Sequence, residues 1–365
     1  MNRKTRVAVL FGGKSGEHDV SLHSASSVMK AMDPNRYEVY PIAINKQGEW
    51  LPGTDALPLL EGKLEEEHVE AISSQLPVLA TASNGGGSLP AFRMNEIDVI
   101  FPVLHGTFGE DGTVQGMLEI ANIPYVGAGV LASAVGMDKV LSKKVFRDAG
   151  LPQGEFTYFL RREWEKDSEA IIAKIESKFQ YPVFLKPANL GSSVGISKAG
   201  NREELIEGIH LAIKYDRKVV VEEFIPAREI EVAVLGNDDP VASMPGEIIS
   251  SNDFYDYNAK YVDGKSIIEI PAKLPADKLE QIREWAIKAY KAIDCSGLSR
   301  VDFFYRKDNG EILINEINTM PGFTQFSMYA KMWEQSGVSY SELVDRLIEL
   351  ALDRFEDKQK SFNSI

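Results

Sequence analysis

Apolar positions in the first hundred residues follow two different periods. Residues 6–11 (RVAVLF) and 37–44 (YEVYPIAI) are short apolar runs that predict buried strands, and 97–104 (IDVIFPVL) predicts a third. Apolar residues over 25–32 recur at the spacing of one helix face. Strand, helix and strand with short connections predict a parallel α/β layer. The polar stretch 62–96, which contains TASNGGGS, predicts an exposed loop or hairpin tip.

The rest of the chain predicts further α/β-type segments. Residues 137–150 predict a helix that ends at a glycine, and a strand over 181–187 follows. Asn201, with a glutamate three residues later, opens a predicted helix that leads to a strand over 218–224. The remainder is rich in predicted strands and ends in a predicted helix over 340–356.

Length and composition agree with several domains in one soluble, globular chain. The 365 residues are long enough for two or three hydrophobic cores, and 44% hydrophobic with 26% charged residues is ordinary for a globular protein. We expect an α/β (α+β) protein of three domains: an N-terminal parallel-sheet domain (1–130), a central domain (131–225) and a C-terminal domain (226–365).

Charge and cysteine content narrow the classes of partner. The formal net charge of −14 argues against nucleic acid or an anionic membrane as the main partner, so an anionic substrate needs local lysines and arginines. One cysteine, Cys295, excludes an intrachain disulfide and a cysteine-based metal cage. We find neither a signal peptide nor an apolar run near the roughly 18 residues of a membrane span, and therefore expect a cytoplasmic protein.

The stretch VLFGGKSGEHDVS near the N-terminus superficially resembles a nucleotide-binding P-loop. The GKS triplet at 13–15 would require a glycine at position 8, where the chain has Ala8, and no dinucleotide-binding glycine pattern fits either. The two glycines are equally consistent with a tight turn between strand and helix. Glu17 and Asp19 could simply interact with the dipole of the following helix.

A better candidate for phosphate binding is the loop 186–198 (KPANLGSSVGISK). Its glycines and serines allow backbone N–H groups to converge on an anion, with Lys186 and Lys198 on either side, although a flexible hairpin tip would have similar composition. In the strand that follows, Glu222 and Glu223 precede two apolar residues and could hold an adenine. Paired glutamates on a strand are also common on solvated faces.

Residues 299–322 (SRVDFFYRKDNGEILINEINTMPG) carry the strongest chemical signal. They predict a β-hairpin in which alternation places Arg300 and Asp302 on one face and Glu316 and Asn318 on one face. Oxygen ligands of these types suit Mg²⁺ or Mn²⁺ that bridge nucleotide phosphates. A salt-bridged surface hairpin is the alternative.

The register of this hairpin decides whether the two carboxylates meet. A two-residue Asn-Gly turn would pair position 302 with 317 and separate them. A three-residue loop over 308–310, with Gly310 in the left-handed region, would pair 302 with 316. We predict the second arrangement.

Taken together and in this order, KPANLGSSVG, VEEFIPAREIEV, RVDFF and NEINTMPG resemble the ATP-grasp superfamily. With GGKSGEHDVSL at the start, HGTFGEDG at 105–112 and FYDYNAKY at 254–261, the chain is similar to the D-alanine–D-alanine ligase family within it. The resemblance covers nearly the whole chain. It implies a three-domain ATP-grasp fold and a homodimer that joins two D-alanines through a D-alanyl phosphate, with ATP as cosubstrate and two Mg²⁺ or Mn²⁺ ions, for peptidoglycan precursor synthesis.

The resemblance also implies roles for individual residues. Phosphate contacts are expected from Lys139 and Lys186, ATP binding from Ser193, and Lys260 would face the nucleotide from the mobile loop. Adenine and ribose contacts are expected from Glu222, Glu223, Ile225 and Glu229. The metal ligands would be Asp302, Glu316 and Asn318, and the oxyanion would be stabilised by Arg300 and the N–H of Gly322. Of the two substrates, the first would lie beside His105 and the second would meet Ser327.

A hydrogen-bonded triad of Glu17, Ser192 and Tyr261 is implied as well. In it Glu17 would anchor the first ammonium group, and a mobile lid over 250–265 would carry Tyr261. Relatives that make D-alanyl–D-lactate are expected to have Phe in place of this tyrosine, so the sequence favours the dipeptide. A D-alanine–D-lactate ligase, another carboxylate–amine ligase and a nucleotide-binding regulator without activity are the alternatives.

Overall fold

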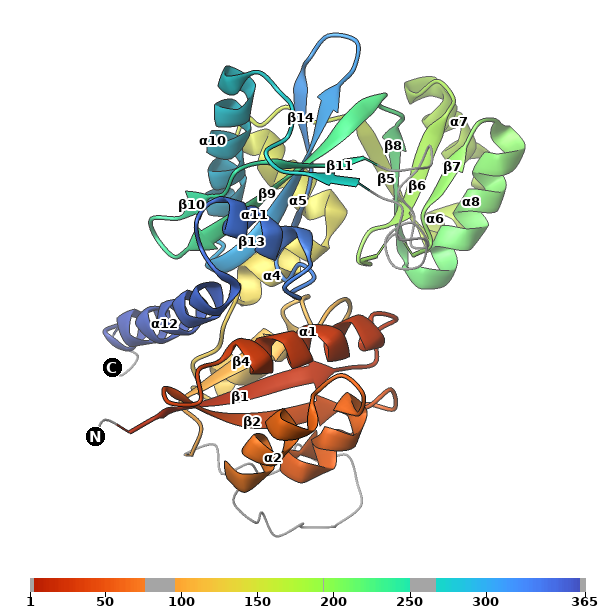
Figure 1. Ribbon diagram of the computed structural model, residues 1–365. Helices are drawn as coiled ribbons and strands as arrows, with labels where there is room; N and C mark the ends of the chain where they lie inside the picture. Colours follow the sequence, from red (N-terminus) through yellow and green to blue (C-terminus); the bar gives the residue numbers. More distant parts are fainter. Residues whose placement is uncertain (1–2, 76–95, 193, 250–266, 362–365) are drawn as a thin grey trace.

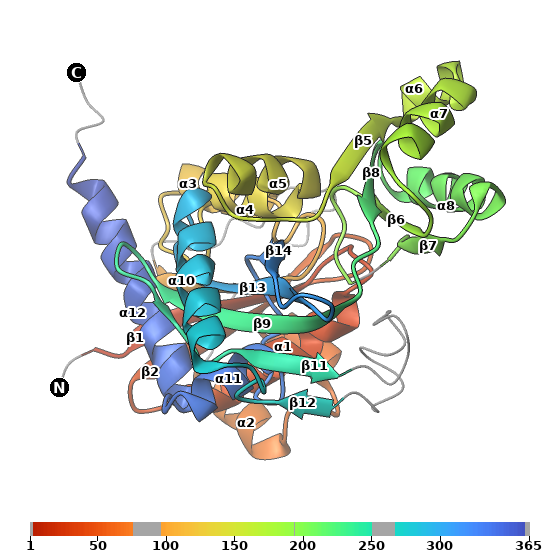
Figure 2. The same ribbon diagram turned by 90° about the horizontal axis from the view of Figure 1, so that it is seen from above.

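The computed structural model describes residues 3–75, 96–192, 194–249 and 267–361. Three sheets form three lobes, with the N-terminal lobe below the other two in Figure 1. Figure 2 shows the middle lobe projecting away from the rest of the molecule. The fold is therefore of the mixed α/β class that the sequence predicts.

The N-terminal lobe contains a four-stranded sheet in the order β3-β2-β1-β4. Its strands are β1 (Thr5–Gly12), β2 (Tyr37–Ile44), β3 (Trp50–Pro52) and β4 (Val99–Val103). Both β2 and β4 pair with β1 in parallel, which confirms the predicted parallel layer, and β3 adds an antiparallel edge. Its helices are α1 (His18–Ala31), the 3₁₀ helix η1 (Gly53–Leu60), α2 (Glu66–Gln75) and α3 (Thr113–Ile120).

The loop predicted over 62–96 is wrong in its first part, because α2 occupies Glu66–Gln75. Ile72 is buried in the N-terminal core and Val69 packs against the same cluster, one helical turn away. Polar composition concealed this short apolar face. The TASNGGGS stretch lies outside the described residues.

The middle lobe is an antiparallel sheet in the order β5-β8-β6-β7. Its strands are β5 (Phe156–Leu160), β6 (Val183–Pro187), β7 (Ser197–Ala199) and β8 (Lys218–Glu223), and its helices are α6 (Arg161–Lys166), α7 (Ser168–Lys178) and α8 (Arg202–Tyr215). The predicted strands and helix are confirmed. The Asn201 side chain accepts from the Glu204 N–H at 2.9 Å, while the Glu204 carboxylate accepts from the Gly200 N–H at 2.7 Å.

The third lobe is a larger antiparallel sheet with the path β12-β11-β9-β13-β14, to which β10 adds at β9. Its strands are β9 (Ala227–Gly236), β10 (Val241–Ala242), β11 (Gly246–Ile249), β12 (Ile267–Glu269), β13 (Gly297–Arg306) and β14 (Ile312–Asn318). The helices α4 (Val130–Met137), α5 (Lys139–Asp148) and α10 (Ala276–Ala292) pack against it, and α11 (Met328–Gln335) contacts β9.

The division into three domains at 130 and 225 remains a proposal. Three sheets agree with it in number, but Ala132 and Phe146, from α4 and α5, belong to the apolar cluster of the third sheet. Helices α4 and α5 therefore pack against the third sheet, although the predicted boundaries assign them to the central domain.

The β13–β14 hairpin confirms the predicted pairing of position 302 with position 316, but the three-residue loop that was expected to produce it is absent from the hairpin. Asp302 lies opposite Glu316, and Gly310 has a φ of 71°. The loop has four residues rather than three, because Arg306 still pairs with Glu311 through a 2.9 Å backbone bond. A register shift after Asp302, a β-bulge, restores the alignment of the two carboxylates.

The last helix, α12 (Tyr340–Gln359), confirms the predicted final helix and extends it slightly. The Ser339 hydroxyl accepts from the Glu342 N–H at 3.3 Å, as a cap should. Leu343 and Leu347 are fully buried, in one apolar cluster with core residues of β1 and α1. No helix within the described ranges is long and apolar enough to cross a membrane.

Gly12 has a positive φ of 92°, and a Cβ there would collide with the Ile44 carbonyl oxygen. We expect Gly12→Ala to lower the free energy of unfolding by at least about 2 kcal/mol, because it adds a clash to a strained backbone. Gly16→Ala is the matched control, since a Cβ at Gly16 meets nothing within 4 Å. Urea-induced unfolding measures both variants, and equal midpoints would contradict the prediction.

Candidate active site

A cavity of about 570 Å³ lies where the three lobes meet. Predicted site residues from all three lobes line it: Glu17, His105, Lys139, Ser192, Arg300, Glu316, Asn318, Gly322 and Ser327. Ser193, Lys260 and Tyr261 lie outside the described residues, as does the predicted lid. The remaining predicted residues lie beyond the lining of this cavity, on β6, β8, β9 and β13 or in the β8–β9 connection: Lys186, Glu222, Glu223, Ile225, Glu229 and Asp302.

Glu17 lies at the start of α1, at the carboxyl edge of the N-terminal sheet. The Ser192 hydroxyl donates to the Glu17 carboxylate, so the predicted contact between these distant segments is present. A Cβ at Gly106 would lie 2.7 Å from Glu17 Oε2, and one at Gly191 would lie 2.8 Å from it. The two glycines therefore let both loops approach the carboxylate closely.

His105 is buried between the N-terminal lobe and the segment after β14. Its Nδ1 lies 3.0 Å from the Met320 carbonyl oxygen, and its Nε2 lies 3.1 Å from Ser24 Oγ. Burial lowers the pKa of His105, although Glu17 and the Met320 carbonyl oppose this. The imidazole is therefore neutral near pH 7, and it lines the cavity together with Glu17.

Glu110 is a buried carboxyl group in the cavity to which sequence reasoning gave no role. Its Oε1 accepts from the Gly106 N–H at 2.9 Å. Burial and the nearby Glu17 carboxylate raise the pKa of Glu110 to about 8. A protonated Glu110 therefore avoids placing two negative charges side by side.

Three acidic residues lie abreast on neighbouring strands of the third sheet. Asp302 on β13 lies opposite Glu231 on β9 and opposite Glu316 on β14. Glu231 lines the cavity, and the sequence reasoning did not single it out. Its alternation with Glu229 along REIEV was the available signal.

Arg300 neutralises much of this acidic row. Its Nε and Nη2 each lie 2.7 Å from a carboxylate oxygen of Asp302, and its Nε lies 3.1 Å from Glu231. Burial would lower the pKa of Arg300, but the two carboxylates outweigh it and raise that pKa well above its usual value. The guanidinium is held as a fixed cation in the cavity wall.

Asp302, Glu316 and Asn318 offer oxygen donors that fit Mg²⁺ or Mn²⁺. The Asn318 carboxamide oxygen accepts from the Met320 N–H at 3.0 Å, which fixes its orientation. Among the residues that the structure describes, no group of three or more His, Cys, Asp or Glu side chains is arranged to hold a metal ion. Such a donor set suits ions that also take ligands from phosphates.

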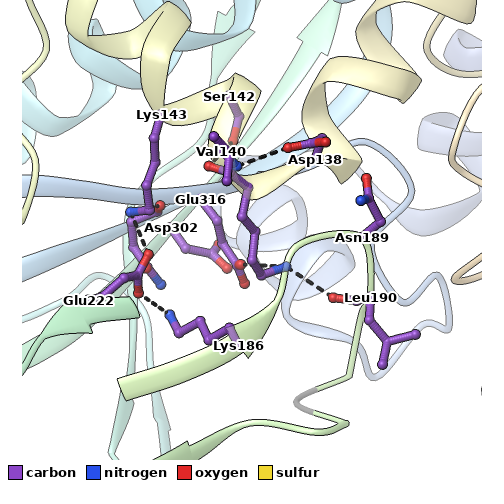
Figure 3. A network of polar contacts seen from close by, with 12 residues as sticks. Asp138, Val140, Ser142, Lys143, Lys186, Asn189, Leu190, Glu222, Asp302 and Glu316 are labelled. Carbon is purple, nitrogen blue, oxygen red and sulfur yellow. Dashed lines mark hydrogen bonds and ion pairs between the residues drawn. The ribbon is translucent and has the colours of Figure 1, made fainter. Parts of the chain in front are cut away.

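Lys143 and Lys186 converge on Glu222 between the middle lobe and the third sheet (Figure 3). Glu222 is buried between them: Lys143 Nζ lies 2.9 Å from Oε1, and Lys186 Nζ lies 2.6 Å from Oε2. Burial would raise the pKa of Glu222, but both ammonium groups oppose this and hold the pKa well below its usual value. Glu222 is therefore ionised. Lys143, like Glu110 and Glu231, was not singled out from the sequence.

Lys139 joins the same region from the first turn of α5. Its ammonium donates to the Leu190 carbonyl at 3.0 Å and lies 3.4 Å from Glu316 Oε2. It therefore links the glycine loop to the acidic row. Lys198 follows the glycine loop on β7, and its ammonium lies 4.3 Å from the centre of the Phe224 ring.

The connection from β8 to β9 lies at the outer end of the region. The Glu223 carboxylate accepts from the Glu155 N–H at 2.7 Å, so its side chain is engaged within the protein. Ile225 lies close to Gly154, where a Cβ would be 2.7 Å from its Cδ1. Glu229 is half-buried on β9.

Ser327 and Gly322 line the cavity just before α11. Ser327 Oγ accepts from the Thr324 N–H at 2.9 Å and lies 2.8 Å from Thr324 Oγ1. A Cβ at Gly322 would lie 3.5 Å from Ser327 Oγ. The turn is thus fixed at the N-terminal end of α11, where partial positive charge favours an anion.

Two antiparallel β-sheet lobes, with lysines and carboxylates converging between them, define this molecule as an ATP-grasp protein. Residues 6–128 match the family model for the D-ala D-ala ligase N-terminus, and residues 145–349 match that for the D-ala D-ala ligase C-terminus. The chain belongs to the D-alanine–D-alanine ligase family.

Individual relatives match over essentially their whole length. The D-alanine–D-alanine ligase of Acetivibrio thermocellus is 52% identical, with 100% of both chains covered, and that of Natranaerobius thermophilus is 54% identical, with 98% of both covered. The solved structure of the D-alanine-D-alanine ligase from Coxiella burnetii has a TM-score of 0.81 at 36% identity, covering 98% of this chain and 97% of that one. VanG D-Ala:D-Ser ligase from Enterococcus faecalis has a TM-score of 0.80 at 38% identity, covering 96% and 100%.

The raised pKa of Glu110 makes stability depend on pH. The carboxyl has an ordinary pKa near 4.5 in the unfolded chain and about 8 in the folded chain, so its contribution is complete below pH 4.5 and is lost as the pH rises through 8. Glu110→Gln resembles the protonated form at every pH. We therefore expect the variant to gain unfolding temperature relative to the wild type between pH 5 and 9.

Exposed Glu207 supplies the control for this experiment, because Glu207→Gln removes a solvated carboxylate. Its unfolding temperature should keep a constant offset from the wild type over the same range. A pH-independent offset for Glu110→Gln would show that Glu110 is already ionised in the fold.

Proposed function

We propose that this chain joins two molecules of D-alanine to D-alanyl-D-alanine while ATP is converted to ADP and phosphate, in peptidoglycan precursor synthesis. The observation that carries the proposal is a single cavity whose lining holds charged groups of different kinds. Glu17, to which Ser192 donates, offers a carboxylate for an ammonium group, and Arg300, Glu231 and Glu316 line the same cavity. Family membership over the whole chain supports the same reaction.

The reaction requires transfer of the ATP γ-phosphoryl group to the carboxylate of the first D-alanine. The amine of the second D-alanine then attacks the acyl carbon, and the tetrahedral intermediate expels inorganic phosphate while the nitrogen loses a proton. Negative charge develops at the transferring phosphoryl group and at the acyl oxygen, so fixed donors are the main source of acceleration. Arg300 and the Gly322 N–H would stabilise the acyl oxyanion.

ATP would lie between the middle lobe and the third sheet. Phosphates would meet Lys139, Lys186, Ser193 and Lys260, while adenine and ribose would meet Glu222, Glu223, Ile225 and Glu229. The present ion pairs support this arrangement, because Lys139 lies 3.4 Å from Glu316 of the third sheet and Lys186 lies 2.6 Å from Glu222 of the middle lobe. For Glu223 the side chain is engaged with Glu155, so a backbone contact to the base is the natural alternative.

Two divalent ions, Mg²⁺ or Mn²⁺, would be held by Asp302, Glu316 and Asn318, with Glu316 shared. When bound, they neutralise phosphate charge and orient the γ-phosphoryl group. The fit rests on three oxygen donors on the paired strands β13 and β14, one of which is already oriented by a backbone N–H.

The first D-alanine would lie beside His105, with its ammonium on Glu17. Ser192 would orient that carboxylate, and Tyr261 would complete the triad from the lid. The second D-alanine would place its carboxylate against Ser327 and the N-terminal end of α11. His105 would act as a neutral wall of the site and not as a cation.

The identity of the second substrate is the narrowest part of the proposal. VanG, whose name specifies D-Ala:D-Ser ligase, has the same fold, so the fold alone does not separate D-alanine from D-serine or D-lactate. Tyr261 and the names of the full-length relatives favour D-alanine over D-lactate. We further propose a cytoplasmic homodimer, as is usual for the family.

The direct test is to incubate the protein with ATP, Mg²⁺ and D-alanine and to identify the product by mass. We expect D-alanyl-D-alanine with one phosphate released for each peptide bond. When D-lactate or D-serine is added in competition, D-alanyl-D-alanine should remain the main product near neutral pH. A preference for either competitor would sink the assignment of the second substrate.

The metal assignment predicts that Glu316→Ala lowers kcat by at least about 100-fold, because a ligand shared by both ions is lost. Glu311→Ala, at an exposed position of the same hairpin, is the matched control and should retain wild-type kcat. Mg²⁺ titration of both variants separates weaker metal binding from misfolding. Unchanged activity in Glu316→Ala would refute the assignment.

A further inference from the structure

Lys143 is a buried cation that the proposed reaction does not use. It lies on α5, one helical turn after Lys139, and is only 4% exposed. Its ammonium lies 2.9 Å from Glu222 Oε1 on β8 and donates to the Asn315 carbonyl on β14 at 3.3 Å. Lys143 therefore joins the middle lobe to the third sheet through α5 (Figure 3).

Stability alone does not account for a lysine at this position. Taking an ammonium group out of water costs several kcal/mol, and a buried ion pair is often no more stable than apolar side chains of the same volume. The site is already crowded with charge, since Glu222 has a second lysine, Lys186, at 2.6 Å. Glu222 thus contacts one more ammonium group than its own neutralisation requires, although Lys186 also lies close enough to Glu316 and Glu229 to interact with them.

The excess is explained if Lys186 leaves Glu222 when a nucleotide binds. Lys186 is proposed to contact phosphates, and a triphosphate competes strongly for its single charge. Without Lys143, Glu222 would then be a buried carboxylate with no cation beside it, which is strongly unfavourable. With Lys143 in place, Glu222 keeps one ion pair and stays oriented while Lys186 turns toward the phosphates.

The second partner of Lys143 connects it to the acidic row. Phe303 pairs with Ile314 and Asp302 pairs with Glu316, so Asn315 is the extra residue of the bulge. Its carbonyl accepts from Lys143 at 3.3 Å. The Gln153 side chain also donates to the Lys143 carbonyl at 2.7 Å, and the Ile314 N–H donates to Pro152 at 2.8 Å, so α5 and the bulge are tied together on both sides.

We propose that Lys143 is a positioning residue for nucleotide selection, which holds Glu222 as an oriented carboxylate acceptor for the 6-amino group of adenine and releases Lys186 to the phosphates. The inference rests on the proposed use of ATP. A carboxylate acceptor rejects a purine that carries an oxygen at position 6, because two acceptors then face each other. Lys143 acts through Glu222 and touches no substrate.

The test compares the binding of ADP and inosine diphosphate, which differ at position 6 of the purine, by calorimetry in Mg²⁺. The wild type should prefer ADP by at least about 10-fold, since a hydrogen bond to a charged group contributes about 1.5–3 kcal/mol. Lys143→Met, which keeps the length but not the charge, should reduce this preference to about threefold or less. Lys143→Arg should keep most of it.

Lys144→Met is the matched control on the same helix. Lys144 is directed to the Tyr158 ring, with its ammonium 4.8 Å from the ring centre, and not to Glu222. The preference of Lys144→Met for ADP over inosine diphosphate should equal that of the wild type. Equal weakening of both nucleotides in Lys143→Met, or no change in either, would overturn the proposal, because a merely structural role moves both affinities together.

A double variant keeps the test decisive if Lys143→Met alone fails to fold. Lys143→Met with Glu222→Gln removes both members of the pair and leaves no unpaired buried charge. Its ADP preference should match that of Glu222→Gln alone, since Lys143 acts through Glu222. A further loss of preference in the double variant contradicts this route. Calorimetry requires no turnover, so a wild type that binds ADP but makes no dipeptide would refute the proposed reaction and leave this inference standing.

Discussion

The fork between Arg300 and Asp302 is the interaction around which the site is arranged. Three carboxylates lie abreast on β9, β13 and β14, and they would repel one another in a buried cleft without a fixed cation between them. Arg300 lies against Asp302 and Glu231, and Lys139 approaches Glu316. A chain with a net charge of −14 can therefore present a locally balanced surface to a polyanionic nucleotide.

The same balance extends through the other buried acids of the site. Glu222 is neutralised by two lysines, whereas Glu110 forms no ion pair within the described ranges and is instead favoured in its protonated form beside Glu17. Paired cation and retained proton are the two ways to bury a carboxyl group at low cost. Glu110 lines the cavity and Glu222 lies outside its lining, so the two ways occur in two separate surroundings.

Sequence reasoning predicted much of the fold because periodicity and turn residues are local signals. The strands β1 and β2, the cap at Asn201 and the opposition of Asp302 and Glu316 are confirmed. The bulge that aligns these carboxylates was not predicted, because an extra residue in a strand leaves no mark in an alternating pattern. Glu110 and Lys143 were missed because the charged groups that act on them, Glu17 and Glu222, come from remote segments. Glu231 was missed although the alternation of REIEV indicated it, and the triad with Tyr261 stays a prediction.

Helix α12 has a consequence for the order in which the chain folds during synthesis. Domains usually fold as they leave the ribosome, the N-terminal one first. Here Leu343 and Leu347 belong to the apolar cluster that includes Val7 and Phe11 of β1, and Arg36 bonds to Asp345. The first sheet to be synthesised therefore lacks part of its core until residues 343–347 have emerged.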